Sequence, residues 1–167
     1  MMKFLMVLLL LFSCNHSDPM SDNLHRVGYQ AAKNIERQCP VDCDSIGRIA
    51  KECKIAQFEV TFHYSKPLTI ENARCLIIKS AQIALETIQN DFAIQEHLYE
   101  TPFEINNLAI FIFTETFTTE ETPIGYLSMV ALSHGKILYE RYDIISNKYE
   151  SLLEETYEEA LQKCQSE

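Results

Sequence analysis

The stretch 69–90, TIENARCLIIKSAQIALETIQN, has the clearest structural pattern in the chain, because its apolar residues recur every three or four positions. They fall on one stripe of an α-helix, and this stripe consists of Ile70, Ala73, Ile77, Ala81, Ala84, Ile88 and, just beyond the stretch, Phe92. Glu71, Lys79, Gln82, Glu86 and Gln89 occupy the opposite side. The pattern predicts an amphipathic helix over 69–98 that Thr69 caps and that could break near Asn90-Asp91.

Four segments around this helix have the period of β-strands. Residues 57–64 alternate apolar with polar side chains, which predicts a half-buried strand. Residues 108–113 are apolar at nearly every position, as expected of an interior strand covered on both faces, and residues 124–132 are similar. Residues 137–142 form the last predicted strand, after a tight hairpin at Ser133-His-Gly-Lys136 in which Gly135 can take a positive φ.

Further helical patterns flank these strands. Residues 21–38 and 44–53 predict two antiparallel helices, and the turn Cys39-Pro-Val-Asp-Cys43 joins them because Pro40 disfavours helix at the preceding residue. Residues 149–164 predict an amphipathic helix with a Glu-rich outer face.

The sequence therefore predicts an α+β domain with about four mostly antiparallel strands. The long helix 69–98 packs across the sheet, between an N-terminal helical hairpin and a C-terminal amphipathic helix. If the strands before and after helix 69–98 are neighbours, this helix joins them as a right-handed crossover.

The chain begins with a sorting signal. Lys3 precedes an unbroken apolar run over residues 4–12, which is too short to span a bilayer because that takes about 20 apolar residues. The motif Leu11-Phe12-Ser13-Cys14 resembles the lipobox of bacterial lipoproteins. The resemblance implies that residues 1–13 are removed as a signal peptide and that Cys14 is acylated as the new N-terminus.

The same resemblance sets the compartment and the domain boundaries. Asn15 is not the Asp usually linked to inner-membrane retention, so the expected location is the bacterial cell envelope, at the outer membrane or the periplasmic face. Residues 14–22 then form a lipid-anchored tether, and residues 23–167 a single domain. Three alternatives remain: a plain signal peptide, a true start at Met20, and a eukaryotic secreted protein with the glycosylation sequon Asn15-His16-Ser17.

The charge of the chain limits its partners. It has 24 acidic and 14 basic residues, a net charge of −10. Loss of residues 1–13 removes Lys3 and leaves a net charge of −11. Nucleic acid is therefore excluded as an expected partner, since its phosphates are bound by clustered Lys and Arg. Anionic lipid surfaces also repel such a chain, so membrane attachment is expected through the covalent lipid.

Five cysteines remain once Cys14 is lipidated, and all five are disulfide candidates in an oxidising compartment: Cys39, Cys43, Cys53, Cys75 and Cys164. Their spacing contains no C-x-x-C, which argues against zinc and against a thioredoxin-like motif. Cys75 lies about 140° round the helix from Ile70, on the polar side. We expect at least one bridge to tie the helical hairpin to the body of the domain.

No motif for catalysis, a cofactor or a metal is found. The glycines are scattered, and the chain has no G-x-S-x-G, no H-E-x-x-H and no EF-hand loop. Among the five histidines, His63 is the best candidate for acid–base chemistry, because it lies on the polar face of the first strand. We therefore expect a non-enzymatic protein-binding module, and the alternative is a small envelope hydrolase that uses His63.

The connection over residues 114–123 suggests where a partner binds. It is long for a hairpin loop, and Phe117 is its single large apolar residue, which makes Phe117 a candidate for partner binding. The acidic charge favours a basic protein as the partner. An inhibitor or immunity protein that guards against a cationic toxin is one such case, with the Glu-rich terminal helix or this loop as its contact surface.

Overall fold

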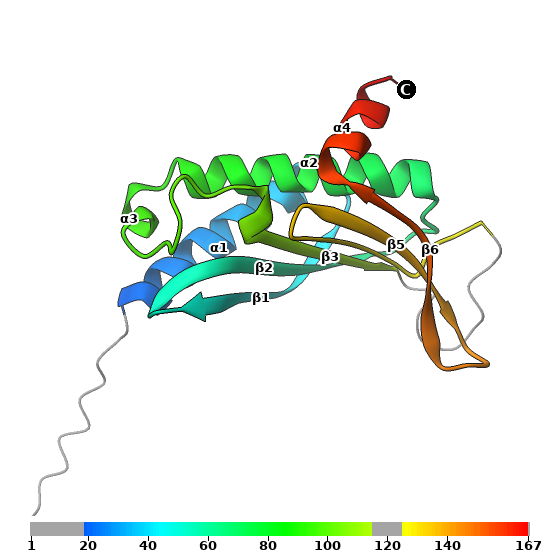
Figure 1. Ribbon diagram of the computed structural model, residues 1–167, viewed down its shortest axis with the longest axis horizontal. Coiled ribbons are helices and arrows are strands. Elements are labelled where there is room, and N and C mark those ends of the chain that lie inside the picture. Colours follow the sequence, from blue (N-terminus) through cyan, green and yellow to red (C-terminus); the bar gives the residue numbers. More distant parts are fainter. Residues whose placement is uncertain (1–18, 115–124, 167) are drawn as a thin grey trace, which may run out of the picture.

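The computed structural model of the protein describes residues 19–114 and 125–166. Its elements in chain order are α1 (Pro19–Gln38), β1 (Asp42–Lys51), β2 (Lys54–Tyr64), α2 (Ile70–Gln89), α3 (Phe92–Gln95), a 3-10 turn η1 (Ile105–Asn107), β3 (Leu108–Thr114), β4 (Met129–Ser133), β5 (Lys136–Asp143), β6 (Lys148–Thr156) and α4 (Tyr157–Ser166). Figure 1 shows two layers, with α1 to α4 all on one face of a single sheet. The core fills the space between these layers.

Within the described residues the sheet has six strands in the order β1-β2-β3-β4-β5-β6, so the α+β class is confirmed but the predicted number of four strands is too low. All neighbouring pairs are antiparallel except β2 and β3, which are parallel. Parallel neighbours need a crossover connection, and α2 lies within it. The helix with the clearest sequence pattern therefore connects the two parallel strands of the sheet.

Helix α2 confirms most of the predicted long helix. The Thr69 side chain accepts a hydrogen bond from the Asn72 amide, and the residues of the stripe from Ala73 to Ile88 are buried. The helix then ends at Asn90-Asp91, as predicted. The Asp91 carboxylate accepts a hydrogen bond from the Ile94 amide and caps the start of the short helix α3. Phe92 is 93% exposed, so it does not continue the apolar stripe.

The predicted second helix, residues 44–53, is wrong, since this segment belongs to β1 and its turn into β2. Glu52 and Cys53 take positive φ values of 51° and 58° and reverse the chain, so that β1 pairs with β2 along its length. The N-terminal helical hairpin is therefore one helix followed by a β-hairpin. Gly28 lets α1 approach this hairpin closely, because a Cβ there would lie 2.7 Å from Ile46 Cγ2.

The predicted terminal helix over 149–164 is wrong in its first half, which forms β6. Leu153 lies opposite Tyr139 of β5, whereas Leu152 points away from the core and is 40% exposed. A capping box begins α4: the Thr156 hydroxyl accepts from the Glu159 amide at 3.2 Å, and the Glu159 carboxylate accepts from the Thr156 amide at 2.8 Å. The helix therefore starts eight residues later than predicted.

Two smaller predictions have different outcomes. The tight turn between β4 and β5 is confirmed, because His134 and Gly135 both have positive φ and Ser133 pairs with Lys136. The strand predicted over 124–132 is shorter in the described residues and covers only Met129–Ser133, while Leu127 forms an isolated bridge with Leu68. Helix α1 begins at Pro19, inside the predicted tether.

Candidate functional site

The sheet face opposite the helices, here called the open face, is apolar at its centre. Strands β3, β4 and β5 contribute Phe111, Phe113, Met129, Ala131 and Leu138. The register aligns Phe111 with Ala131 and Ala131 with Leu138, so these side chains adjoin one another across the strands. Except for Ala131, which is buried, all are partly exposed. None of the helices in the described part of the chain covers this face (Figure 1).

This arrangement corrects one expectation about β3. The strand is interior, between β2 and β4, but the prediction that both of its faces are covered does not hold for residues 19–114 and 125–166. Ile110 and Ile112 face the helices and are fully buried, whereas Phe111 on the other face is partly exposed. A strand that is apolar on both faces is normally buried on both, so the open face has the composition of an interface.

Carboxylates flank this apolar centre. Glu59 lies beside Ala109 on the β2 side, and Glu140 lies beside Met129 on the β5 side. Both side chains are partly buried, and burial raises the pKa of Glu140. An apolar centre with a carboxylate on each side is complementary to a surface that combines apolar and basic side chains.

His63 lies on the same open face, near the edge formed by β1. Its neighbours in the sheet register are Asp42 on β1 and Phe113 on β3. Neither is a nucleophile of the serine or cysteine type, so the pairing does not assemble the nucleophile and base that the hydrolase alternative needs. In the described part of the chain, no group of three or more His, Cys, Asp or Glu side chains could hold a metal ion.

One disulfide, between Cys75 of α2 and Cys164 of α4, confirms that two of the five candidate cysteines pair. Their Cα atoms are 5.4 Å apart, within the ordinary range for a disulfide. Cys39 is a buried free thiol, Cys43 is half-buried and Cys53 is exposed. We expected a bridge between the N-terminal segment and the body of the domain. This disulfide instead joins the last helix to the central one.

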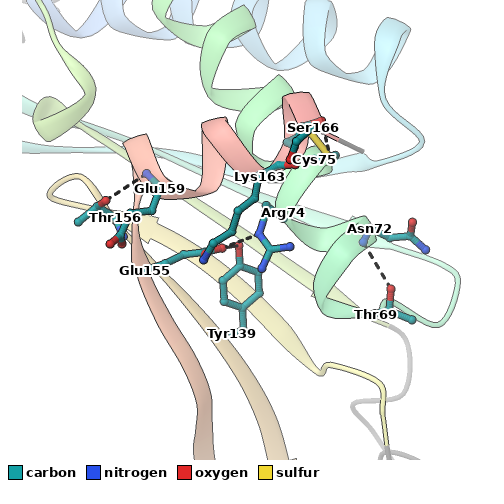
Figure 2. Close-up of polar contacts among 11 residues, drawn as sticks. Thr69, Asn72, Arg74, Cys75, Tyr139, Glu155, Thr156, Glu159, Lys163 and Ser166 are labelled. Carbon is teal, nitrogen blue, oxygen red and sulfur yellow. Dashed lines mark hydrogen bonds and ion pairs between the residues drawn. A yellow bond between two sulfur atoms is a disulfide. The ribbon is translucent and has the colours of Figure 1, made fainter.

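A buried cluster of charged and polar groups lies beside this disulfide (Figure 2). Three donors converge on the Glu155 carboxylate: Arg74 Nε at 2.7 Å, the Tyr139 hydroxyl at 2.6 Å and Lys163 Nζ at 2.5 Å. Glu155 is 5% exposed and Arg74 7%. The cluster thus joins α2, β5, β6 and α4 at one point.

The electrostatics of the cluster indicate a structural role. Burial by itself would raise the pKa of Glu155, but the hydrogen bonds from Arg74, Lys163 and Tyr139 outweigh it and lower this pKa. Burial, followed by the adjacent carboxylate, raises the pKa of Tyr139. Glu155 is therefore an ionised acceptor already engaged by three donors, which makes it unsuited to act as a general base.

The Glu-rich outer face expected for a terminal helix is divided among other roles. Glu155 is buried in the cluster, Glu150 pairs with Arg141, and Glu154 pairs with Lys136. Glu159 closes the capping box of α4. The structure therefore does not assemble these carboxylates into the single acidic contact surface that the sequence suggested.

A groove of about 460 Å³ lies between α1 and α2. Its walls are mostly polar, and their groups bond to one another: Gln30 Nε2 donates to Asn34 Oδ1 at 2.9 Å, and Asn34 Nδ2 donates to Thr87 Oγ1 at 3.1 Å. These contacts join the two helices, so we interpret the groove as part of their packing.

The hairpin of β5 and β6 carries the most exposed apolar pair of the sheet layer at its tip. Ile145 is 88% exposed and Ile144 47%. The sequence pattern does not predict this pair at a hairpin tip. A helix over residues 149–164 would remove β6, the second strand of the hairpin. A signal was present in Asp143-Ile-Ile-Ser-Asn147, where turn-forming residues enclose two isoleucines that have no apolar stripe to join.

Two predicted sites lie outside the described residues: the lipidation site Cys14 and the partner-binding candidate Phe117. Comparison with protein-family models, with curated proteins and with solved structures found no match to this chain. Three features of the molecule bear on its function: the open face, the β5–β6 hairpin and the sorting signal.

Proposed function

We propose that this protein is a non-enzymatic, lipid-anchored protein of the bacterial cell envelope that binds another protein through the open face of its sheet. The observation that carries the proposal is the set of partly exposed apolar side chains on β3, β4 and β5, on a face that no described helix covers. Burial of such side chains contributes about 25 cal/mol per Å², so a partner that covers them gains affinity.

The shape and chemistry of the open face support a protein as the occupant. Its centre is a row of adjoining side chains, Phe111, Ala131 and Leu138. Protein interfaces have this form, with aromatic and aliphatic anchors at the centre and polar groups at the rim. The rim here includes Glu59 and Glu140.

The charge supports a basic partner, such as a cationic toxin that an inhibitor or immunity protein would neutralise. The net charge of −10, or −11 after removal of residues 1–13, attracts a basic protein before contact and raises its association rate. Salt screens this attraction over about 8 Å at physiological ionic strength. Binding should therefore weaken with salt, mainly through the on-rate.

The envelope location and the anchor are parts of the same proposal. The lipobox resemblance of residues 11–14 supports acylation of Cys14. The disulfide between Cys75 and Cys164 is compatible with an oxidising compartment such as the periplasm. In the part of the chain that the structure describes, no helix is long and apolar enough to cross a membrane.

The test uses the mature protein as bait in an envelope extract, followed by binding kinetics with each purified partner. The double variant Phe111→Ala with Leu138→Ala should weaken binding about tenfold or more, as expected for central interface residues. Tyr29→Ala is the matched control, because Tyr29 is an exposed aromatic residue on α1, in the helix layer. Thermal unfolding checks that all variants fold. A partner that binds the double variant and wild type equally, with no salt dependence, would contradict the proposal.

Intact mass tests the anchor separately. Membrane-extracted protein should lack residues 1–13 and carry added lipid mass, and Cys14→Ala should leave unprocessed precursor. A Cys14→Ala protein that is processed normally to a soluble form would reject the anchor without affecting the assignment of the open face.

A further inference from the structure

The β5–β6 hairpin extends beyond the rest of the sheet. β4 pairs with β5 only as far as Glu140, whereas the pairing of β5 with β6 continues to Asp143 and Lys148. Residues 141–150 therefore form a two-stranded ribbon, which projects away from the helix layer in Figure 1. Isolated two-stranded ribbons are marginally stable, so one that projects with an apolar tip is expected to have a binding role.

Three chemical zones follow one another from the tip of this ribbon. Ile144 and Ile145 form the exposed apolar end. Behind them, the rings of Tyr142 and Tyr149 pack edge to face with centroids 5.3 Å apart, and the Tyr142 hydroxyl bonds to Asn147. Further back, Arg141 pairs with Glu150. Apolar, aromatic and charged groups thus appear in the order in which a bilayer interface presents acyl chains, glycerol region and headgroups.

The ribbon is also electrically neutral in an acidic protein. Arg141 and Lys148 balance Asp143 and Glu150, while the whole chain has a net charge of −10. Anionic headgroups repel most of this surface but not the ribbon. Lys148 lies next to the tyrosine pair, where its ammonium group can reach headgroup phosphates.

We propose that the tip of the β5–β6 hairpin, with Ile144 and Ile145 at its end, docks into the interface of the lipid bilayer as a second membrane contact beside the acylated Cys14. This inference rests on the lipid anchor of the proposed function.

The length of the chain before α1 favours the bilayer over a partner protein at this tip. Residues 14–18 separate the anchor from α1 and reach at most about 17 Å when extended, so the start of α1 stays near the membrane. In Figure 1 the start of α1 and the hairpin tip lie toward opposite ends of the long axis, both on the side away from α2 and the C-terminus. One bilayer surface can therefore meet both contacts.

A single-tryptophan experiment tests the docking, since the chain contains no tryptophan. The mature lipoprotein is reconstituted into vesicles of phosphatidylethanolamine and phosphatidylglycerol, with and without dibrominated acyl chains that quench indole fluorescence on contact. Ile145→Trp places the indole at the tip. Phe92→Trp is the matched control, because Phe92 is 93% exposed and belongs to α3 in the helix layer.

The indole introduced by Ile145→Trp should lose about half of its emission in brominated vesicles, because interfacial side chains reach the acyl boundary. The control should lose about a tenth or less, since solvent surrounds its indole. Equal loss in both variants, or loss in neither while the protein floats with the vesicles, would overturn the docking and leave the anchor intact.

Three further results separate the proposals. Protein that does not float with the vesicles would reject both the anchor and the docking. A blue-shifted tip indole in protein without vesicles would assign the tip to a contact between copies of this chain, and so overturn the docking. Failure to recover a partner for the open face, with the tip indole quenched as expected, would reject only the protein-binding function.

Discussion

Removal of the Cys75–Cys164 disulfide should destabilise the domain strongly, because this bridge holds helix α4 against α2. Helix α4 has ten residues, and Ala160 is its only buried residue. A helix this short is marginal in water by itself, so α4 depends on its attachments. These include the disulfide to α2, the contact of Lys163 with Glu155, and the packing of Tyr157 and Leu161 against the core. The double variant Cys75→Ala with Cys164→Ala removes the first and weakens the second.

The magnitude follows from the sequence separation of 89 residues. Loop-closure entropy for such a loop corresponds to about 4.6 kcal/mol at 25 °C in the chain-entropy description. Because a domain of this size loses about 2–4 °C in Tm per kcal/mol, the midpoint should fall by about 9–18 °C.

Guanidinium and thermal unfolding, each with and without reductant, measure this effect. Wild type with reductant should behave like the double variant, whereas Cys53→Ser, at the exposed free thiol, should behave like unreduced wild type. Peptide mapping of non-reduced protein should recover the Cys75–Cys164 pair. Five free thiols, or a midpoint that reductant does not change, would contradict the stabilising role of this disulfide.

Three further predictions concern the core. Glu155→Ala should lower the free energy of unfolding by about 3–5 kcal/mol, since it removes the carboxylate to which buried Arg74 donates. Glu154→Ala, at a half-exposed pair, should have a much smaller effect in the same denaturant titration. The pKa of Glu155 is lowered in the folded protein, so its contribution to the free energy of unfolding is complete above the ordinary value of 4.5 and is lost as the pH falls below it. Glu155→Gln should therefore flatten the acid limb of the stability–pH curve. Gly28→Ala should cost about 1–3 kcal/mol by overpacking, unlike Gly47→Ala, whose added Cβ makes only ordinary contacts, and thermal unfolding compares the two.

The candidate site could be predicted from sequence only in part. The apolar run over 108–113 identified β3 as an interior strand, but a run that is apolar at every position cannot show which face lacks cover. The expected acidic contact surface does not form as one helix face, because residues 149–156 belong to a strand. In β6 their side chains alternate between the two sides of the strand, and Glu155 turns inward to Arg74.

Sequence patterns are sufficient to predict the elements whose period and end signals agree. Helix α2 combines a long apolar stripe with the Thr69 cap, residues 58–64 of β2 alternate apolar with polar side chains, and the β4–β5 turn has Gly135 where a positive φ is needed. The strand conformation of Asp42–Lys51 and Lys148–Thr156 depends on tertiary contacts, because apolar spacings of three and four over so few residues fit a paired strand as well as a helix. β2 and β5 supply those partners through the backbone hydrogen bonds of the sheet. The pairing of Cys75 with Cys164 was decided in the same way, since only the packing of α4 on α2 brings two residues 89 positions apart into contact.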